Sequence, residues 1–169
     1  MKAVESVILF VFFIFFASCL DESIGSEILV THRGYPNVDE ALWPHFDAFE
    51  KAASDRGYDL DLSSMALHGN ITNIQDENVA GSCSYGGRMN QRDVLIDLEF
   101  WNRSSHLYRE YIIFHELGHC VLGQDHREAC FTNRTWTSLM RSGLGSCRDN
   151  YKESTRSYYL DELFEVVLP

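Results

Sequence analysis

Residues 115–126 constrain the fold more than any other part of the chain. They read His-Glu-Leu-Gly-His-Cys-Val-Leu-Gly-Gln-Asp-His. Residues four apart lie on one face of a helix, so His115 and His119 can reach one metal ion while Glu116 stands beside it. Gly123 can end the helix in a left-handed turn and return His126 to the same ion. The segment therefore predicts a helix that carries a Zn2+ site, with Glu116 placed to activate a water on the metal.

The flanks of this segment predict a long, buried helix. Ser104 or Ser105 can N-cap it. Apolar residues recur at helical spacing along one side, and the opposite side is apolar as well. The two sides comprise Leu107, Tyr111, Ile112, His115, Gly118, His119 and Leu122, and Leu117, Cys120 and Val121. A helix that is apolar nearly all round belongs at the centre of its domain. The alternative, two buried histidines without a metal, leaves the glycine break and the third histidine as coincidences.

The identity of the third ligand is open between two neighbours, Asp125 and His126. Imidazole suits zinc well, and Gly123 supplies the turn that would bring His126 back to the metal. A carboxylate oxygen is also an acceptable zinc ligand, so Asp125 is the alternative. If His126 binds the metal, Asp125 either orients a ligand histidine from outside or stays in solvent. We favour His126.

The motif resembles that of the metzincin group of zinc peptidases, which is H-E-x-x-H-x-x-G-x-x-H followed by a methionine turn. Here Gly123 and His126 each come one residue later, which gives H-E-x-x-H-x-x-x-G-x-x-H. Asp125 therefore occupies the position of the histidine in the shorter pattern. One added helical residue brings about 1.5 Å of rise and 100° of rotation, so the returning loop must follow a different path.

A closer resemblance extends beyond the motif. Residues 109–120, 79–83 and 158–164 look similar to small bacterial lipoprotein metallopeptidases that carry this longer spacing. The resemblance implies a zincin-like fold and a zinc-dependent endopeptidase that acts on peptide or protein substrates.

Met140 is the candidate for the methionine turn. It lies fourteen residues after His126, where a metzincin places the methionine beneath its metal site. A methionine beside a leucine is also common in ordinary protein cores. The resemblance further implies that Glu116 is the catalytic base and that His115, His119 and His126 bind the Zn2+ ion.

The N-terminal residues 1–18 predict an export signal, because a lysine precedes an uninterrupted apolar run too short to span a membrane. Residues 16–19, Phe-Ala-Ser-Cys, resemble a bacterial lipobox, in which Cys19 is lipidated. The alternative is ordinary cleavage next to that cysteine. Residues 19–33 would form a tether and residues 34–169 the folded domain. We expect export, either as a lipoprotein at the bacterial cell envelope or as a secreted protein.

Charge and length limit the partners. The chain of 169 residues has a net charge of -11, and the region 1–18 contains one basic and one acidic residue, so its removal leaves that charge unchanged. Such a balance disfavours binding to nucleic acid or to an anionic membrane face. About 150 mature residues suffice for one domain with a substantial core. We expect a monomer that meets membranes only through the lipid anchor.

Export would place the cysteines in an oxidising compartment. Besides Cys19 the chain has four of them, and three pairings are formally possible. We predict a bond between Cys130 and Cys147, which would pin the loop beneath the metal site. A bond between Cys83 and Cys120 would tie a strand to the zinc helix. No two cysteines have the C-x-x-C spacing typical of cysteine metal sites.

The remaining elements are predicted around the zinc helix. An amphipathic helix over 38–56 comes first, and a final helix covers 156–167. Strands are predicted over 59–68, 79–85 and 94–100, the last two joined by a turn at Gly86-Gly87. The fold class is therefore α/β in the broad sense, of the α+β type. A small sheet would pack on the central zinc-binding helix, with N- and C-terminal helices on its flanks.

Two classes of function are open. In the catalytic one, three neutral ligands leave zinc with its charge and an open position, and Glu116 moves the proton. The strand over 79–85, if it edges the cleft, could bind an extended peptide as an added strand. The alternative is a lipid-tethered binding module with a structural, non-catalytic zinc closed by a fourth protein ligand. Glu116 favours catalysis, because a structural site has no use for it.

Overall fold

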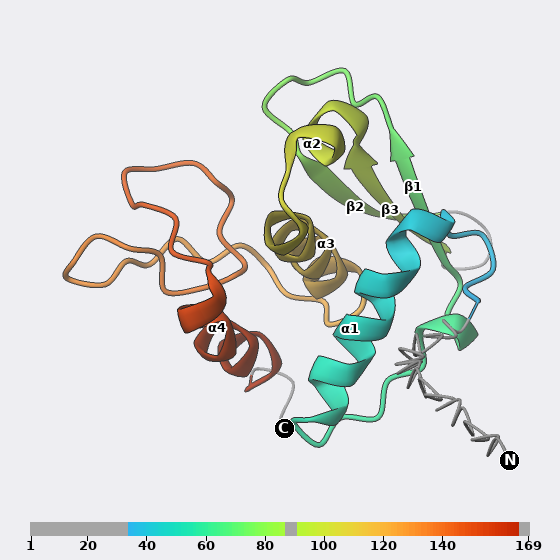
Figure 1. Cartoon of the computed structure of the whole chain (residues 1–169), viewed down its shortest axis with the longest axis horizontal. Coiled ribbons are helices and arrows are strands. Elements are labelled where there is room, and N and C mark those ends of the chain that lie inside the picture. Colours follow the sequence, from blue (N-terminus) through green and yellow to red (C-terminus); the bar gives the residue numbers. More distant parts are fainter. Residues whose placement is uncertain (1–33, 87–90, 166–169) are drawn as a thin grey trace, which may run out of the picture. The chain divides into compact units, whose positions relative to one another are not determined.

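The computed structural model describes residues 34–86 and 91–165. The chain divides into two units, residues 1–30 and 31–169, and the described residues belong to the second. The predicted signal, Cys19 and the tether lie outside the described residues and stay predictions. The described elements, shown in Figure 1, are η1 (Glu40–Leu42), α1 (Trp43–Ser54), η2 (Leu62–Ser64), β1 (Leu67–Thr72), β2 (Gly81–Gly86), β3 (Gln91–Asp97), α2 (Leu98–Arg103), α3 (His106–Cys120) and α4 (Glu153–Glu165).

The three strands form one sheet in the order β1-β3-β2 (Figure 1). In the centre, Val94 of β3 pairs with Gly69 of the parallel strand β1 and with Cys83 of the antiparallel strand β2. Val94 and Ile96 are buried and carry the sheet's share of the apolar core. Because β2 is an edge strand, one of its two sides has no partner strand among the described residues.

Helix α3 lies between the sheet and the helices α1 and α4 (Figure 1). Its residues Ile113, Phe114 and Leu117 are fully buried. Phe49 of α1 joins the three helices, because its ring centroid lies 5.0 Å from that of Phe114 and 5.1 Å from that of Phe164 in α4. These rings bury large apolar areas where the helices meet. The predicted central position of the motif helix is therefore confirmed.

A buried ion pair also connects α3 to α4. Glu110 of α3 is buried and accepts hydrogen bonds from Arg156, at 2.6 Å from Nε and 3.0 Å from Nη2. Tyr151, just before α4, donates its hydroxyl to the same carboxylate. A buried carboxylate is tolerated when it is paired and hydrogen-bonded in this way. The contact holds α4 against α3 at about one turn before His115.

The predicted fold class is confirmed, since the described residues form a small sheet with several helices of the α+β type. The strand predicted over 59–68 is wrong over most of its length, because only Leu67 and His68 belong to β1. Asp61 instead caps η2 by accepting the amide proton of Ser63, and Leu62 turns into the core. The alternation of polar and apolar residues in this stretch is outweighed by the local hydrogen bonds of Asp61.

Other boundaries shift for local reasons. The strand predicted over 94–100 ends at Asp97, whose carboxylate caps α2 through the amide of Phe100. The helix predicted over 38–56 begins in α form at Trp43, with Pro44 in its first turn, where proline is tolerated. The predicted antiparallel pairing of β2 and β3 is confirmed. Of the predicted turn at Gly86-Gly87, Gly86 belongs to β2 and Gly87 lies outside the described residues, as do positions 166 and 167 of the predicted last helix.

Candidate metal centre

Helix α3 has the start and the end that its sequence predicts. Ser105 caps it by accepting the amide proton of Tyr108 at 3.3 Å. After Cys120 the chain leaves the helix through Gly123, whose φ of 65° lies in the left-handed region that favours glycine. The amides of Gly123 and Gln124 donate to carbonyl groups of the last turn, each at 3.1 Å. This closed turn directs the following residues back toward the helix.

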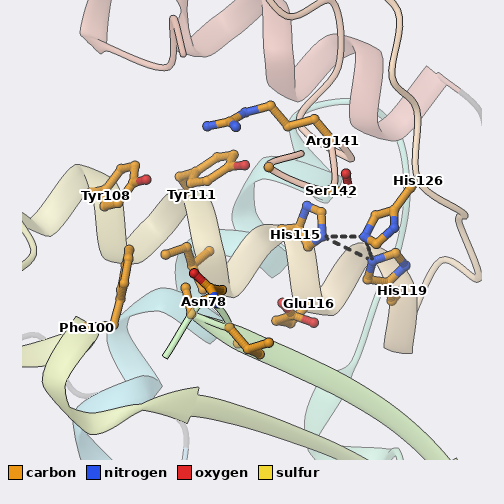
Figure 2. A pocket seen from close by; sticks show the side chains of 15 residues that line it. Asn78, Phe100, Tyr108, Tyr111, His115, Glu116, His119, His126, Arg141 and Ser142 are labelled. Atoms are coloured by element: carbon orange, nitrogen blue, oxygen red, sulfur yellow. Dashed lines mark hydrogen bonds between the residues drawn. The ribbon is translucent and has the colours of Figure 1, made fainter. Parts of the chain in front are cut away.

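Three histidines converge where the chain returns (Figure 2). The Nε2 atom of His119 lies 3.1 Å from that of His115 and 3.1 Å from that of His126. The remaining distance, from His115 to His126, is 3.2 Å. The three nitrogen atoms thus form a nearly equilateral triangle. Within the described part of the chain, no other group of three or more histidine, cysteine or acidic side chains is arranged to hold a metal ion.

The outer nitrogens of two of these rings face carbonyl oxygens. His115 Nδ1 lies 2.9 Å from the carbonyl oxygen of Leu139, and His119 Nδ1 lies 2.6 Å from that of Gln124. A carbonyl oxygen only accepts, so each Nδ1 carries the proton and each Nε2 keeps its lone pair. Lone pairs pointed at one centre repel each other unless a cation lies between them. This donor set therefore fits a metal ion, and the carbonyl groups orient its ligands as in known metal sites.

His126, rather than Asp125, is the third member of the cluster. The carboxylate of Asp125 is exposed and lies outside the group of three. The extra residue before Gly123 therefore moves the turn and the histidine together, as the kept Gly-x-x-His spacing predicts. Whether His126 binds an ion stays a prediction, but its position beside His115 and His119 is the one that ligation requires.

Burial changes the pKa values of the histidines and of Glu116 in opposite directions. It lowers the pKa of His115 to about 4 and lowers the pKa of His119 below its ordinary value, which keeps both imidazoles neutral at physiological pH. Neutral imidazole is the form that binds metals. Burial also raises the pKa of the Glu116 carboxyl to about 8. A carboxyl group with a pKa near neutrality is suited to accept a proton and to release it.

Glu116 lies against the start of the edge strand β2. A Cβ atom placed on Gly81 would come within 2.9 Å of both Cγ and Oε1 of Glu116, and within 3.1 Å of Ile112 Cγ2. Only glycine leaves room for this approach. An isolated glycine in a strand often marks the close approach of another group. The glycine at position 81 is therefore the sequence signal that could have pointed to this contact. The contact brings the edge of the sheet directly beside the carboxylate.

Met140 packs beneath the motif helix. It is fully buried, and its sulfur lies so close to Gly118 that a Cβ atom at that position would overlap it. The preceding residue, Leu139, supplies the carbonyl oxygen that faces His115. The segment around Met140 is therefore in contact with the cluster from below. Its role as a metzincin-type methionine turn stays a prediction.

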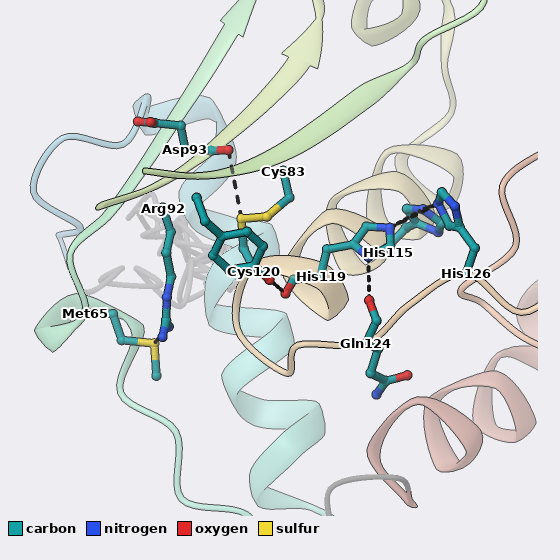
Figure 3. Close-up of a disulfide and its surroundings, with 10 residues drawn as sticks. Met65, Cys83, Arg92, Asp93, His115, His119, Cys120, Gln124 and His126 are labelled. Atoms are coloured by element: carbon teal, nitrogen blue, oxygen red, sulfur yellow. Dashed lines mark hydrogen bonds between the residues drawn. A yellow bond between two sulfur atoms is a disulfide. The ribbon is translucent and has the colours of Figure 1, made fainter. Parts of the chain in front are cut away.

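The cysteines lie at disulfide distance in the predicted pairing. Cys83 and Cys120, with Cα atoms 5.6 Å apart, join β2 to the end of α3 next to His119 (Figure 3). Cys130 and Cys147, with Cα atoms 6.3 Å apart, bracket the segment that contains Met140. Two such pairs fit an oxidising, extracellular environment. In the described part of the chain, none of the helices combines the length and the apolar character needed to cross a bilayer.

A pocket of about 370 Å³ opens beside the histidines and runs along α3 (Figure 2). Its lining begins at His115, Glu116, His119 and His126 and continues over β2 and the segment after Met140. The strand predicted over 79–85 lines the pocket with its first three residues, and the residues that sequence reasoning did not single out are Asn78, Phe100, Tyr108, Arg141, Ser142 and Gly143. They come from four separate stretches of chain, so no local pattern connects them.

Comparison with known proteins adds no relative. No family model matches this chain, and neither a curated protein nor a solved structure matches it. The resemblance to metzincins therefore rests on the motif and on the geometry of the histidine cluster alone.

Proposed function

We propose that this protein is a zinc-dependent endopeptidase. The observation that carries the proposal is the position of Glu116, a buried carboxyl on the wall of the same open pocket that three converging imidazoles line. The cluster comprises three histidines and no fourth protein ligand among the described residues. Structural zinc sites are closed by four protein ligands, whereas catalytic sites keep one position free.

His115, His119 and His126 would hold the ion. When bound there, zinc would polarise the substrate carbonyl and lower the pKa of a water molecule. Glu116 would accept a proton from the water whose oxygen attacks the carbonyl carbon. It would then deliver that proton to the leaving nitrogen as the C–N bond breaks. The products are a carboxylic acid and an amine.

The unpaired side of β2 would hold the substrate. An extended peptide can add to an exposed sheet edge through main-chain hydrogen bonds. The residues at the start of β2 and just before it line the pocket, and Gly81 brings this edge next to Glu116. The main chain of a peptide bound to this edge would therefore run next to the Glu116 carboxylate.

The proposal is tested by Glu116→Gln in zinc-loaded protein. We expect zinc content to stay the same, because the three imidazoles are intact. Peptide hydrolysis should fall by about 100-fold to 10,000-fold, because glutamine cannot accept the proton. Metal analysis and digestion of a peptide library measure the two quantities.

Glu99→Gln serves as the matched control. This carboxylate lies on the surface of α2, where it pairs with Arg103, and its loss should change neither quantity. Undiminished hydrolysis in zinc-loaded Glu116→Gln would contradict the proposal. Tight zinc binding without any hydrolysis in the unsubstituted protein would favour the binding module with a structural zinc.

A further inference from the structure

The pocket continues beyond the catalytic groups and ends among aromatic rings. Figure 2 shows the histidines at one end of the pocket and Tyr108, Tyr111 and Phe100 at the other. Tyr108 and Tyr111 lie on α3, two turns and one turn before His115, and Phe100 comes from α2. The ring centroids of Phe100 and Tyr108 are 5.2 Å apart, and those of Tyr108 and Tyr111 are 5.5 Å apart.

These rings form one wall of the pocket, and part of their apolar surface is not covered by other residues. Phe100 and Tyr108 are only half-buried, although both pack against the core. Ile112, which is buried, adds an aliphatic surface between the rings and Glu116. A ring placed against such a wall gains both apolar burial and favourable ring–ring contacts.

The charges of the pocket favour neither a basic nor an acidic side chain. Among the described lining residues Glu116 is the one carboxylate, and Arg141 is the one guanidinium. The Arg141 guanidinium lies over the rings of Tyr111 and Trp136, at 5.1 and 5.2 Å from their centroids. It also pairs with Asp149 at 3.3 Å, so an acidic side chain would compete with an existing partner.

The position of Glu116 determines which substrate residue meets this wall. In the proposed reaction Glu116 gives its proton to the leaving nitrogen. Glu116 and Ile112 both adjoin Gly81, so the carboxylate lies on the aromatic side of the pocket. The residue that contributes the leaving nitrogen therefore projects its side chain toward Ile112 and the rings.

We propose that this protein cleaves peptides before a large aromatic residue, whose side chain is held against Phe100, Tyr108 and Tyr111. This inference rests on the proposed endopeptidase function. It makes Phe100 and Tyr108 specificity-determining residues, since both present free ring surface to the pocket.

The first experiment compares peptides that differ only at the residue after the cleaved bond. Zinc-loaded protein should cleave the phenylalanine peptide with a kcat/KM about 10-fold to 100-fold above that of the alanine peptide. The lysine and glutamate peptides should not exceed the alanine peptide. Equal values for phenylalanine and alanine, or the highest value for lysine or glutamate, would overturn the inference while leaving the endopeptidase function intact.

Substitution of the wall provides the second test. Phe100→Ala should lower kcat/KM for the phenylalanine peptide toward the value for the alanine peptide, and so remove most of the phenylalanine preference. Phe131→Ala is the matched control, because Phe131 is a phenylalanine with accessible ring surface outside this pocket. An unchanged preference in Phe100→Ala would show that the wall does not select the substrate.

A binding measurement separates this inference from the proposed function. Two small hydroxamic acids, one with a benzyl group and one with a methyl group, are titrated into zinc-loaded protein by calorimetry. The benzyl compound should bind about 10-fold or more tightly, and Phe100→Ala should abolish the difference. That result without any peptide hydrolysis would support the pocket and contradict the endopeptidase. Equal affinities, or no binding of either compound, would contradict the proposal that this pocket holds an aromatic side chain.

Discussion

At the scale of single residues, two backbone carbonyl groups decide what the histidines can bind. The carbonyl oxygens of Leu139 and Gln124 each accept a proton from a ring Nδ1, which leaves the Nε2 lone pairs facing each other. Neither carbonyl group can be recognised in the sequence, because every residue has one. What the sequence predicts is the glycine turn that carries Gln124 past His119.

A pair of substitutions tests the third ligand. His126→Ala should lower zinc affinity far more than Asp125→Ala, because it removes a member of the triangle, whereas Asp125 is exposed outside it. Loss of an orienting partner typically costs about 10-fold to 100-fold in metal affinity, which is the upper limit expected for Asp125→Ala. Competitive chelation at fixed pH measures both affinities. The reverse order would assign the metal to the carboxylate.

At the scale of elements, the contact between β2 and α3 positions the Glu116 carboxyl. The disulfide between Cys83 and Cys120 and the approach of Gly81 to Glu116 join the same two elements at two places. The edge strand and the motif helix are thus held in a fixed relation beside Glu116 and His119. A peptide bound to this edge would therefore lie at a fixed position relative to the Glu116 carboxyl.

Gly81→Ala tests this contact. The added methyl group would overlap Glu116, whose side chain must swing aside, since the strand backbone is held by its pairing with β3. A displacement of about 1 Å at a catalytic group can cost about 100-fold, so we expect kcat to fall by at least about 10-fold with zinc content unchanged. Gly86→Ala in the same strand meets no neighbour within 4 Å and should leave kcat unchanged. Equal kcat values for the two variants would show that Gly81 does not position Glu116.

At the scale of the whole molecule, stability depends on a buried histidine remote from the metal centre. His45 of α1 is 4% exposed and stacks on His106 at the start of α3, with Trp101 at its edge. Burial and the nearby His106 lower the pKa of His45 to about 4. The ring is therefore neutral in the folded protein and gains its proton more readily on unfolding.

This shift predicts the pH dependence of folding. Below about pH 6.5 the unfolded chain binds a proton at this ring that the folded chain does not bind until pH falls to about 4. The free energy of unfolding should therefore decrease as pH falls between these values, by up to about 3 kcal/mol from His45. Urea unfolding with a chelator present, compared between the unsubstituted protein and His45→Phe, measures the contribution. Parallel curves for the two proteins would contradict it.

The sequence by itself determined the motif helix and its glycine break, because these depend on spacing along the chain. It left three cysteine pairings formally possible, and the structure brings the preferred one to disulfide distance. Helical geometry places His115 and His119 on one face whatever surrounds them. The sheet was predicted only in part. The strand over 59–68 was wrong because Asp61 forms local hydrogen bonds that alternation does not reveal.

Only the tertiary structure decided that His126 joins the cluster, that Gly81 adjoins Glu116 and that aromatic rings line the far end of the pocket. Each of these contacts joins residues from different elements. Such contacts depend on how the helices and the sheet pack, and packing is set by the shapes of side chains far apart in sequence. A periodic pattern reports which face of an element is buried but not which neighbour covers it.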